Sequence, residues 1–167
     1  MAAMVLAASA CSAPTRKVPG ATTGDRLPTD QVLTGTFTRP ALTVEGLPVK
    51  AVGPGWTADI TVSGPTVPGE GLPYQAPSTT CTWTVTISHA TASIPLSLTD
   101  FNSIDHLGHI YAMAAVPSGP TVPTRVGPGQ TVTFQIRAYE LVGEGVMRWA
   151  PDRQHIVGEW DFEVEND

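Results

Sequence analysis

The feature that most limits how this chain can fold is the stretch from Cys81 to His89, which reads Cys-Thr-Trp-Thr-Val-Thr-Ile-Ser-His. Large apolar residues alternate in it with Thr and Ser, and neither Gly nor Pro interrupts the alternation. Because side chains along a β-strand point to the two faces of a sheet in turn, this period of two predicts a strand with one buried face. The side chains expected to face the core are those of Cys81, Trp83, Val85 and Ile87.

The same one-sided alternation recurs along most of the chain from residue 32 onward. It predicts further strands at 32–38, 41–52, 56–63, 94–99, 109–115, 130–139, 146–150 and 157–165. Asp100–Gly108 is predicted to be a turn region, and the prolines at 40 and 48 place the first two strands at sheet edges, because proline cannot donate a ladder hydrogen bond. With 16 Gly, 16 Pro and only 14% charged residues, the composition also favours short strands and many turns. These patterns predict an all-β fold, an antiparallel two-sheet β-sandwich of about eight or nine strands.

A short repeat accompanies the predicted strands. Val52–Pro77 aligned with Val126–Pro151 gives ten identities in 26 positions, including Val-Gly-Pro-Gly in both copies. One interpretation is a pair of related turn–strand–loop–strand units, one in each half of the sandwich. The other is that Gly-Pro-Gly is a turn sequence that has been used twice.

Composition and motifs exclude several classes of function. A formal net charge of −6, without a Lys/Arg cluster, argues against nucleic acid as a partner. No apolar run in the sequence reaches the roughly 18 residues that span a bilayer. The chain has no Gly-x-Ser-x-Gly turn and its four histidines are scattered, so we expect neither an enzyme nor a bound cofactor.

The first ten residues, Met-Ala-Ala-Met-Val-Leu-Ala-Ala-Ser-Ala, are small and apolar and end at Cys11. They resemble the end of a bacterial lipoprotein signal peptide, with Ala8-Ser9-Ala10-Cys11 as the lipobox. The resemblance implies that Cys11 becomes the first residue of the mature protein and carries its acyl chains. The alternative interpretation is an Ala-rich disordered start.

Three regions follow from this reading: a signal-peptide remnant at 1–10, lipidated Cys11 with a flexible tether at 11–31, and the sandwich at 32–167. The tether is predicted to be disordered because it has few large apolar residues and no periodicity. The expected location is extracytoplasmic, either secreted or held at the cell membrane by the lipid. Lipidation of Cys11 leaves Cys81 without an intramolecular partner, whereas an unlipidated chain could join the two.

His106, His109 and Met113 form a string of candidate metal ligands. Imidazole and thioether together suit copper. The rise of a strand puts His109 and Met113 about 13 Å apart if both lie on one strand, so the two histidines, across the turn at Gly108, are the better pair. The competing interpretation is a polar loop with two solvated imidazoles and a methionine in the core or at an edge.

A row of acidic residues ends the chain. Glu159, Asp161, Glu163 and Glu165 alternate with Trp160, Phe162 and Val164. Four carboxylates on one face could attract Ca²⁺, but neighbours at i and i+2 are about 6.5 Å apart and no loop wraps an ion. We expect a solvent-facing row whose charges discourage pairing with other chains.

Residues 50–165 resemble the small secreted immunogenic immunoglobulin-like proteins of mycobacteria. The resemblance rests on Trp56 at the start of a strand, Asp-Phe-Asn at 100–102, Gly108-x-x-Tyr111 after it, and Pro-Gly before Gln130. It implies an immunoglobulin-like sandwich without a catalytic site, exported from an actinobacterial cell.

The function expected from these features is a non-catalytic, lipid-anchored interaction module of the cell envelope, which binds an envelope protein or a wall component. Loops on a rigid scaffold usually carry recognition, and the longest here are Gly64–Thr80 and Pro117–Pro128. Leu72 and Tyr74 are the candidate contact residues. The alternative is a carrier of a small ligand or of copper, which uses the His106/His109 turn.

Overall fold

The alternating stretch that begins at Cys81 belongs to an interior strand of a six-stranded sheet. A neighbouring strand pairs with it along each of its two edges. The computed structural model describes residues 32–69 and 76–164. These residues form thirteen strands and one short 3₁₀ helix, η1: β1 (Leu33–Thr36), β2 (Ala41–Val44), β3 (Pro48–Gly53), β4 (Trp56–Thr66), β5 (Ser78–Ser88), β6 (Ile94–Pro95), η1 (Leu98–Asp100), β7 (Phe101–Asp105), β8 (Ile110–Ala112), β9 (Ala114–Ala115), β10 (Arg125–Val126), β11 (Val132–Leu141), β12 (Gly143–Trp149) and β13 (Gly158–Val164). In the described parts of the chain, no helix is long and apolar enough to cross a membrane.

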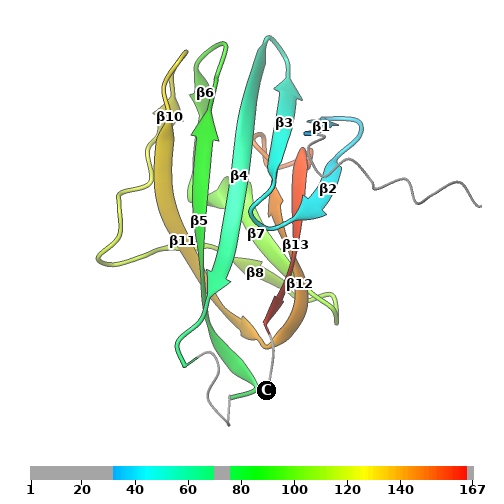
Figure 1. The fold of residues 1–167 in the computed structure, drawn as a ribbon, viewed down its shortest axis with the longest axis vertical. Coiled ribbons are helices and arrows are strands. Elements are labelled where there is room, and N and C mark those ends of the chain that lie inside the picture. Colours follow the sequence, from blue (N-terminus) through cyan, green and yellow to red (C-terminus); the bar gives the residue numbers. More distant parts are fainter. Residues whose placement is uncertain (1–31, 70–75, 165–167) are drawn as a thin grey trace, which may run out of the picture. The chain divides into compact units, whose positions relative to one another are not determined.

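Two sheets pack face to face (Figure 1). The first has the order β1-β3-β4-β5-β11-β9, the second has the order β2-β13-β12-β7-β8, and β6 pairs with β10 in a small ribbon. The predicted all-β, immunoglobulin-like sandwich is therefore confirmed. Ladders within both sheets are antiparallel except where β1 pairs with β3 and β2 pairs with β13.

On each side of the sandwich, one continuous chain segment provides the edge strands of both sheets. On one side, β1 is the edge of the first sheet and β2, after a short turn, is the edge of the second. On the other side, β8 is the edge of the second sheet and β9 is the edge of the first, with Met113 between them. A strand that changes sheets in this way ties the two layers together at their margins.

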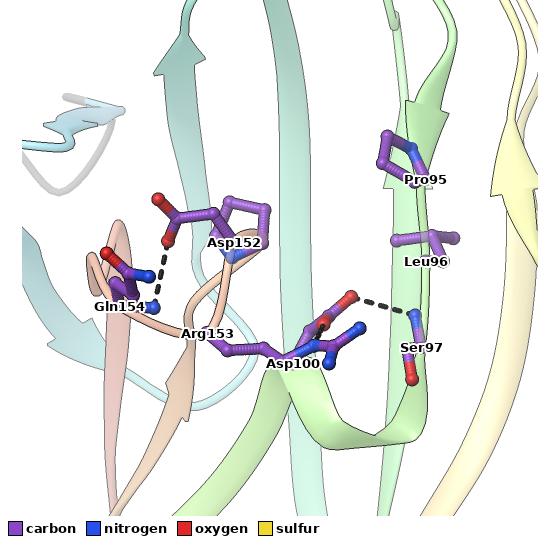
Figure 2. Close-up of a pocket in the computed structure, with 8 residues that line it drawn as sticks. Pro95, Leu96, Ser97, Asp100, Asp152, Arg153 and Gln154 are labelled. Atoms are coloured by element: carbon purple, nitrogen blue, oxygen red, sulfur yellow. Dashed lines mark hydrogen bonds and ion pairs between the residues drawn. The ribbon is translucent and has the colours of Figure 1, made fainter.

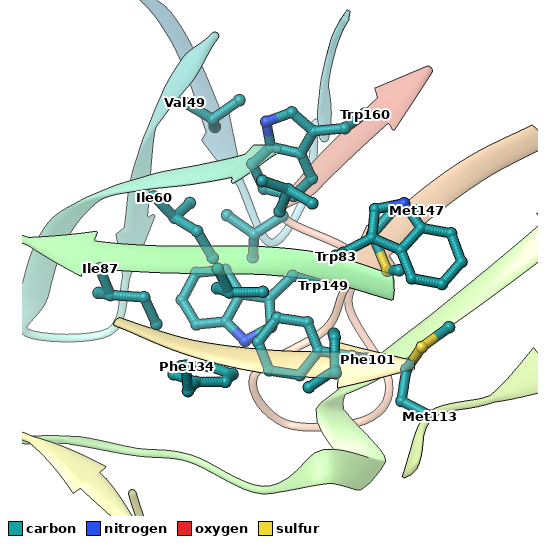
Figure 3. Packing of buried hydrophobic residues seen from close by; sticks show 14 of the residues in the cluster. Val49, Ile60, Trp83, Ile87, Phe101, Met113, Phe134, Met147, Trp149 and Trp160 are labelled. Carbon is teal, nitrogen blue, oxygen red and sulfur yellow. The ribbon is translucent and has the colours of Figure 1, made fainter. Parts of the chain in front are cut away.

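Aromatic side chains fill the space between the sheets (Figure 3). Trp149 on β12 stacks on Phe101 with ring centroids 6.2 Å apart, and Phe101 meets Phe134 of the opposite sheet edge to face at 5.8 Å. Trp83 on β5 meets Phe162 on β13 at 5.3 Å. The two layers are thus joined by aromatic pairs, which contribute about 0.5–1.5 kcal/mol each beyond the area that they bury.

The strand predictions hold best where the alternation is longest. The predicted inward residues of β5, from Cys81 to Ile87, are fully buried, and the Thr and Ser residues between them are not. Trp160, Phe162 and Val164 of β13 are buried as predicted.

Several predicted boundaries are wrong. The strand predicted at 94–99 is a strand only at Ile94–Pro95, which is β6, and Leu98–Asp100 forms η1. Asp100–Gly108 is not a turn region, because 101–105 forms β7, a buried strand of the second sheet. The predicted strand 41–52 is two strands in different sheets, separated by a turn in which Gly46 has a φ of +80°. Its second part, β3, is not at an edge, and Pro48 is accommodated as the first residue of that strand. The predicted strand 109–115 divides at Met113 between the two sheets.

The two Val-Gly-Pro-Gly copies are both turns. Gly55 and Gly129 have φ values of +78° and +69°, a left-handed conformation that glycine adopts without strain. The strands that follow them, β4 and β11, lie on either side of β5 in one sheet. The interpretation as one unit in each half of the sandwich is therefore wrong, and repeated turn chemistry explains the match.

Trp149→Ala tests the aromatic packing. The substitution removes a fully buried indole that contacts both Trp56 and Phe101, so we expect the free energy of unfolding to fall by about 3–5 kcal/mol. Urea denaturation followed by circular dichroism measures it. Tyr139→Ala, at a side chain that is 68% exposed, is the control and should change stability by no more than about 0.5 kcal/mol. Equal effects of the two substitutions would contradict this packing.

Candidate functional site

A pocket of about 550 Å³ opens where the segment around β6 and η1 faces the loop between β12 and β13 (Figure 2). Apolar walls and polar groups share its lining: Pro95, Leu96, Ser97, Asp100, Pro151, Asp152, Arg153 and Gln154. Its volume falls in the range of small-molecule sites, which are about 300–1,000 Å³. The pocket is therefore large enough for a single sugar-sized ligand.

Asp100 forms the floor of the pocket and is held by η1. Its Oδ2 accepts a hydrogen bond from the backbone N–H of Ser97 at 2.8 Å, while the Ser97 hydroxyl accepts one from Thr99 N–H at 3.3 Å. This reciprocal capping box fixes the carboxylate, which is buried. Burial raises the pKa of Asp100, and the Ser97 N–H and the Arg153 guanidinium oppose that rise.

Arg153 reaches across the pocket toward this carboxylate. Its Nε lies 3.7 Å from Asp100 Oδ1, yet its side chain is 68% exposed. Figure 2 shows the guanidinium between the loop and Ser97. The backbone of Arg153 has a φ of +64°, which costs a residue with a Cβ about 1–2 kcal/mol. Such strain is often found at functional sites.

The contacts of Asp152 with the residues after Arg153 hold the loop, and with it Arg153, in that conformation. Asp152 accepts hydrogen bonds from the backbone N–H groups of Gln154 and His155 at 3.0 and 2.8 Å, and its other oxygen lies 2.7 Å from His155 Nδ1. The His155 contacts, followed by the Gln154 N–H, lower the pKa of Asp152 to about 2. The His155 ring in turn stacks on Phe37 with centroids 5.3 Å apart.

The lining of the pocket combines hydrogen-bond donors and acceptors. The guanidinium offers several donors, and Asp152 and Gln154 offer acceptors beside it. The Ser97 hydroxyl shares a hydrogen bond with Thr99 at 2.9 Å, and the eight described lining residues include neither histidine nor cysteine. The sequence alone does not predict this pocket. The polar run Asp152–His155 between two apolar strands was its only signal.

The structure separates the predicted metal ligands. Met113 is buried in the core cluster, whereas His106 and His109 are exposed. Among residues 32–69 and 76–164, no three His, Cys, Asp or Glu side chains are grouped as a metal site. The copper-carrier alternative gains no support from this placement and stays a prediction.

His109 instead belongs to a cluster around the buried Asp105. One Asp105 oxygen accepts the backbone N–H groups of Leu107 and His109, each at 2.9 Å. The other lies 2.9 Å from His109 Nδ1 and accepts the Tyr111 hydroxyl at 2.8 Å. Burial alone would raise the pKa of Asp105, but these hydrogen bonds outweigh it and hold the pKa below its usual range. They also explain how β7 ends on a carboxylate inside the fold.

A third buried carboxylate lies between the sheets. Glu140 on β11 is 2% exposed, its Oε2 accepts a hydrogen bond from the Ser103 hydroxyl of β7, and its carboxylate also accepts one from the Cys81 thiol. Its Oε1 has no hydrogen-bond partner among the described residues. Burial raises the pKa of Glu140, and burial together with the charge of Glu140 raises the pKa of Cys81. Cys81 is therefore a buried, protonated thiol, as its position on the inner face of the strand predicts.

The remaining predicted site residues belong to other parts of the chain. Cys11, Leu72 and Tyr74 all lie outside the described residues. The predicted signal remnant and tether at 1–31 lie outside them as well.

Glu140→Gln tests the buried carboxylate through the pH dependence of stability. Because the folded-state pKa lies above the unfolded value of about 4.3, the proton is bound more tightly in the folded protein. The wild type should therefore lose stability relative to Glu140→Gln as pH rises from about 4 toward neutral. By pH 8 we expect the variant to be the more stable by about 1 kcal/mol. Urea titrations at several pH values measure this, with Glu163→Gln on the surface as control. Parallel curves for the wild type and Glu140→Gln would contradict it.

Comparison with known proteins adds evidence about the fold. No protein-family model matches the sequence, and no curated protein matches it. Among solved structures, the chain is similar to MPT63, a secreted protein from Mycobacterium tuberculosis, with a TM-score of 0.52 and 16% identity over 74% of this chain and 98% of that one. It also matches a candidate lipoprotein from Bacillus subtilis, with a TM-score of 0.48 and 11% identity over 64% of this chain and 36% of that one. The likeness to MPT63 concerns the fold alone, an immunoglobulin-like β-sandwich.

Proposed function

We propose that this chain is a non-catalytic binding module of the cell envelope, anchored outside the cytoplasm by lipid on Cys11, and that the Arg153 pocket holds its ligand. The observation that carries the proposal is the Arg153 guanidinium, 68% exposed above a buried carboxylate on a strained, braced loop. An arginine whose side chain was merely solvated would not require a strained backbone or a loop held in place by hydrogen bonds.

The extracytoplasmic location rests on the amino terminus. Small apolar residues lead to Ala-Ser-Ala-Cys, the pattern of a lipobox. MPT63, which has a similar fold, is described as secreted. The actinobacterial origin belongs to the same proposal and rests on the resemblance of residues 50–165.

The chemistry of the pocket points to a hydroxylated ligand with a carboxylate, such as a sugar acid of the cell wall. A guanidinium binds carboxylates through paired N–H donors. The Gln154 amide offers a donor and an acceptor to hydroxyl groups, and Leu96 and the two prolines offer apolar contact to a sugar ring. A wall component is thus a better fit to this site than a hydrophobic small molecule.

Titration with glucuronate tests the pocket. We expect weak, saturable binding, seen as chemical-shift changes at Ser97, Arg153 and Gln154 in NMR spectra of the full chain. Glucose, which lacks the carboxylate, should bind at least tenfold more weakly, and Arg153→Ala should weaken glucuronate binding by a similar factor. Arg137→Ala, on the other sheet, is the matched control. Glucuronate binding that survives Arg153→Ala, or no binding at all, would refute the ligand assignment.

Lipidation is tested separately, by expressing the natural gene in a bacterium with lipoprotein-processing enzymes and feeding an alkyne analogue of palmitate. The wild type should carry the label and sediment with membranes. Cys11→Ser should lose the label and become soluble, while Cys81→Ala, at the other cysteine, should keep it. Label retained in Cys11→Ser would show that the lipobox interpretation is wrong.

A further inference from the structure

The outer face of the second sheet carries a row of side chains that crosses all five strands and is aliphatic on four of them. Cross-strand pairing places Val44 beside Asp161, Asp161 beside Val146, Val146 beside Ile104, and Ile104 beside Ile110. Directly opposed residues have Cβ atoms about 4.5–5.5 Å apart, so three of the aliphatic residues are in contact. Ile110 is 67% exposed and Val44 is 50% exposed.

Acidic side chains surround this row. Glu144 and Glu163 oppose each other on β12 and β13, Asp161 interrupts the row, and Glu159 lies one pair further along. Glu159 is bonded to Arg148 at 3.1 Å, but the described residues give no ion pair to Glu144, Asp161 or Glu163. Like charges directly opposite one another destabilise a sheet. Within the part of the chain that the structure describes, this face therefore combines carboxylates that have no ion-pair partner with exposed aliphatic surface.

We propose that this face, defined by Val44, Ile104, Ile110, Val146, Asp161 and the two glutamates Glu144 and Glu163, is a docking surface for a protein partner with an aliphatic centre and a rim of Lys or Arg. Charge complementarity favours a basic protein partner over a second copy of this chain or an anionic membrane. A second copy would bring its own acidic rim against this one, and an anionic membrane surface would be repelled in the same way. The proposal is independent of the Arg153 pocket.

The size of the face indicates a transient complex. Five strands about 4.8 Å apart, with about five residues at 3.3 Å, make a face of about 24 by 17 Å, or roughly 400 Å². A standard stable complex buries roughly 800 Å² on each partner. We therefore expect a dissociation constant in the micromolar range or weaker, with rapid exchange and strong dependence on salt.

The test is an NMR titration of the full chain, carrying Cys11→Ser for solubility, with the acetylated and amidated peptide Lys-Ile-Lys-Val-Lys-Ile-Lys. Saturable shifts should map to β7, β8, β12 and β13 on this face, and raising NaCl from 50 to 500 mM should weaken binding several-fold. Ile110→Asp and Asp161→Lys should each weaken it at least tenfold, since one removes apolar contact and the other reverses a charge. Both sites are exposed, so both variants should keep the wild-type circular dichroism spectrum.

Three controls make the result decisive. Tyr139→Asp, on the outer face of the other sheet, should leave peptide binding unchanged, and the same peptide with Glu in place of Lys should not bind. Shifts that map elsewhere, equal binding of the Glu peptide, or no saturable binding would overturn the proposal. So would self-association in sedimentation velocity that Ile110→Asp abolishes, or binding to phosphatidylglycerol vesicles that it abolishes, because these assign the face to a second copy or to lipid.

Discussion

The register between β5 and β11 is the constraint on which the sandwich depends. The two strands pair over ten residues, from Val132 opposite Ile87 to Leu141 opposite Ser78. In this register Phe134, Ile136 and Ala138 face the same interior as Trp83 and Val85, but so does Glu140. A slip of one residue would expose the apolar set and turn Glu140 outward. Burying one Phe or Ile stabilises the fold by about 1.5–3 kcal/mol, so the apolar residues together outweigh the few kcal/mol that an incompletely paired carboxylate costs.

The cost of Glu140 is reduced by the way the second sheet is built. Strand β7 places Ser103 opposite Glu140 and, two residues on, ends at Asp105, which takes four hydrogen bonds from its own turn and from β8. The second sheet therefore supplies polar groups where the first sheet brings a charge. The two sheets are also connected at their edges. The β1–β2 segment and the β8–β9 segment each contribute an edge strand to both sheets, so the edge strands of one layer are covalently linked to those of the other.

The sequence was sufficient for those elements whose inner face is uniformly apolar. The β5 and β13 alternations predict both strand and orientation, and the fold class follows from them. It failed at β7, because Asn102, Ser103 and Asp105 have the composition of a turn. The burial of Ser103 and Asp105 depends on polar partners, among them Glu140 of β11 and Tyr111 of β8, that only the fold brings near. It also failed to separate β2 from β3 and β8 from β9, since a period of two says nothing about which sheet a strand joins. The Arg153 pocket was missed for a related reason: Asp100 and Arg153 are 53 positions apart and meet only after folding.

The Arg153 pocket and the outer face of the second sheet, to which we assign roles, both include residues or conformations that the core does not require. At the pocket, Arg153 occupies a left-handed conformation in which Gly or Asn would avoid most of the strain. On the outer face, Glu144 opposes Glu163, and Ile110 is exposed where Thr or Lys would serve an edge strand better. Neither feature contributes to the interior, which is already closed by the aromatic pairs between β5, β7, β11, β12 and β13. Local departures from the most stable choice are expected where a protein binds something else, and the pocket and the outer face of the second sheet each include such departures, on different elements.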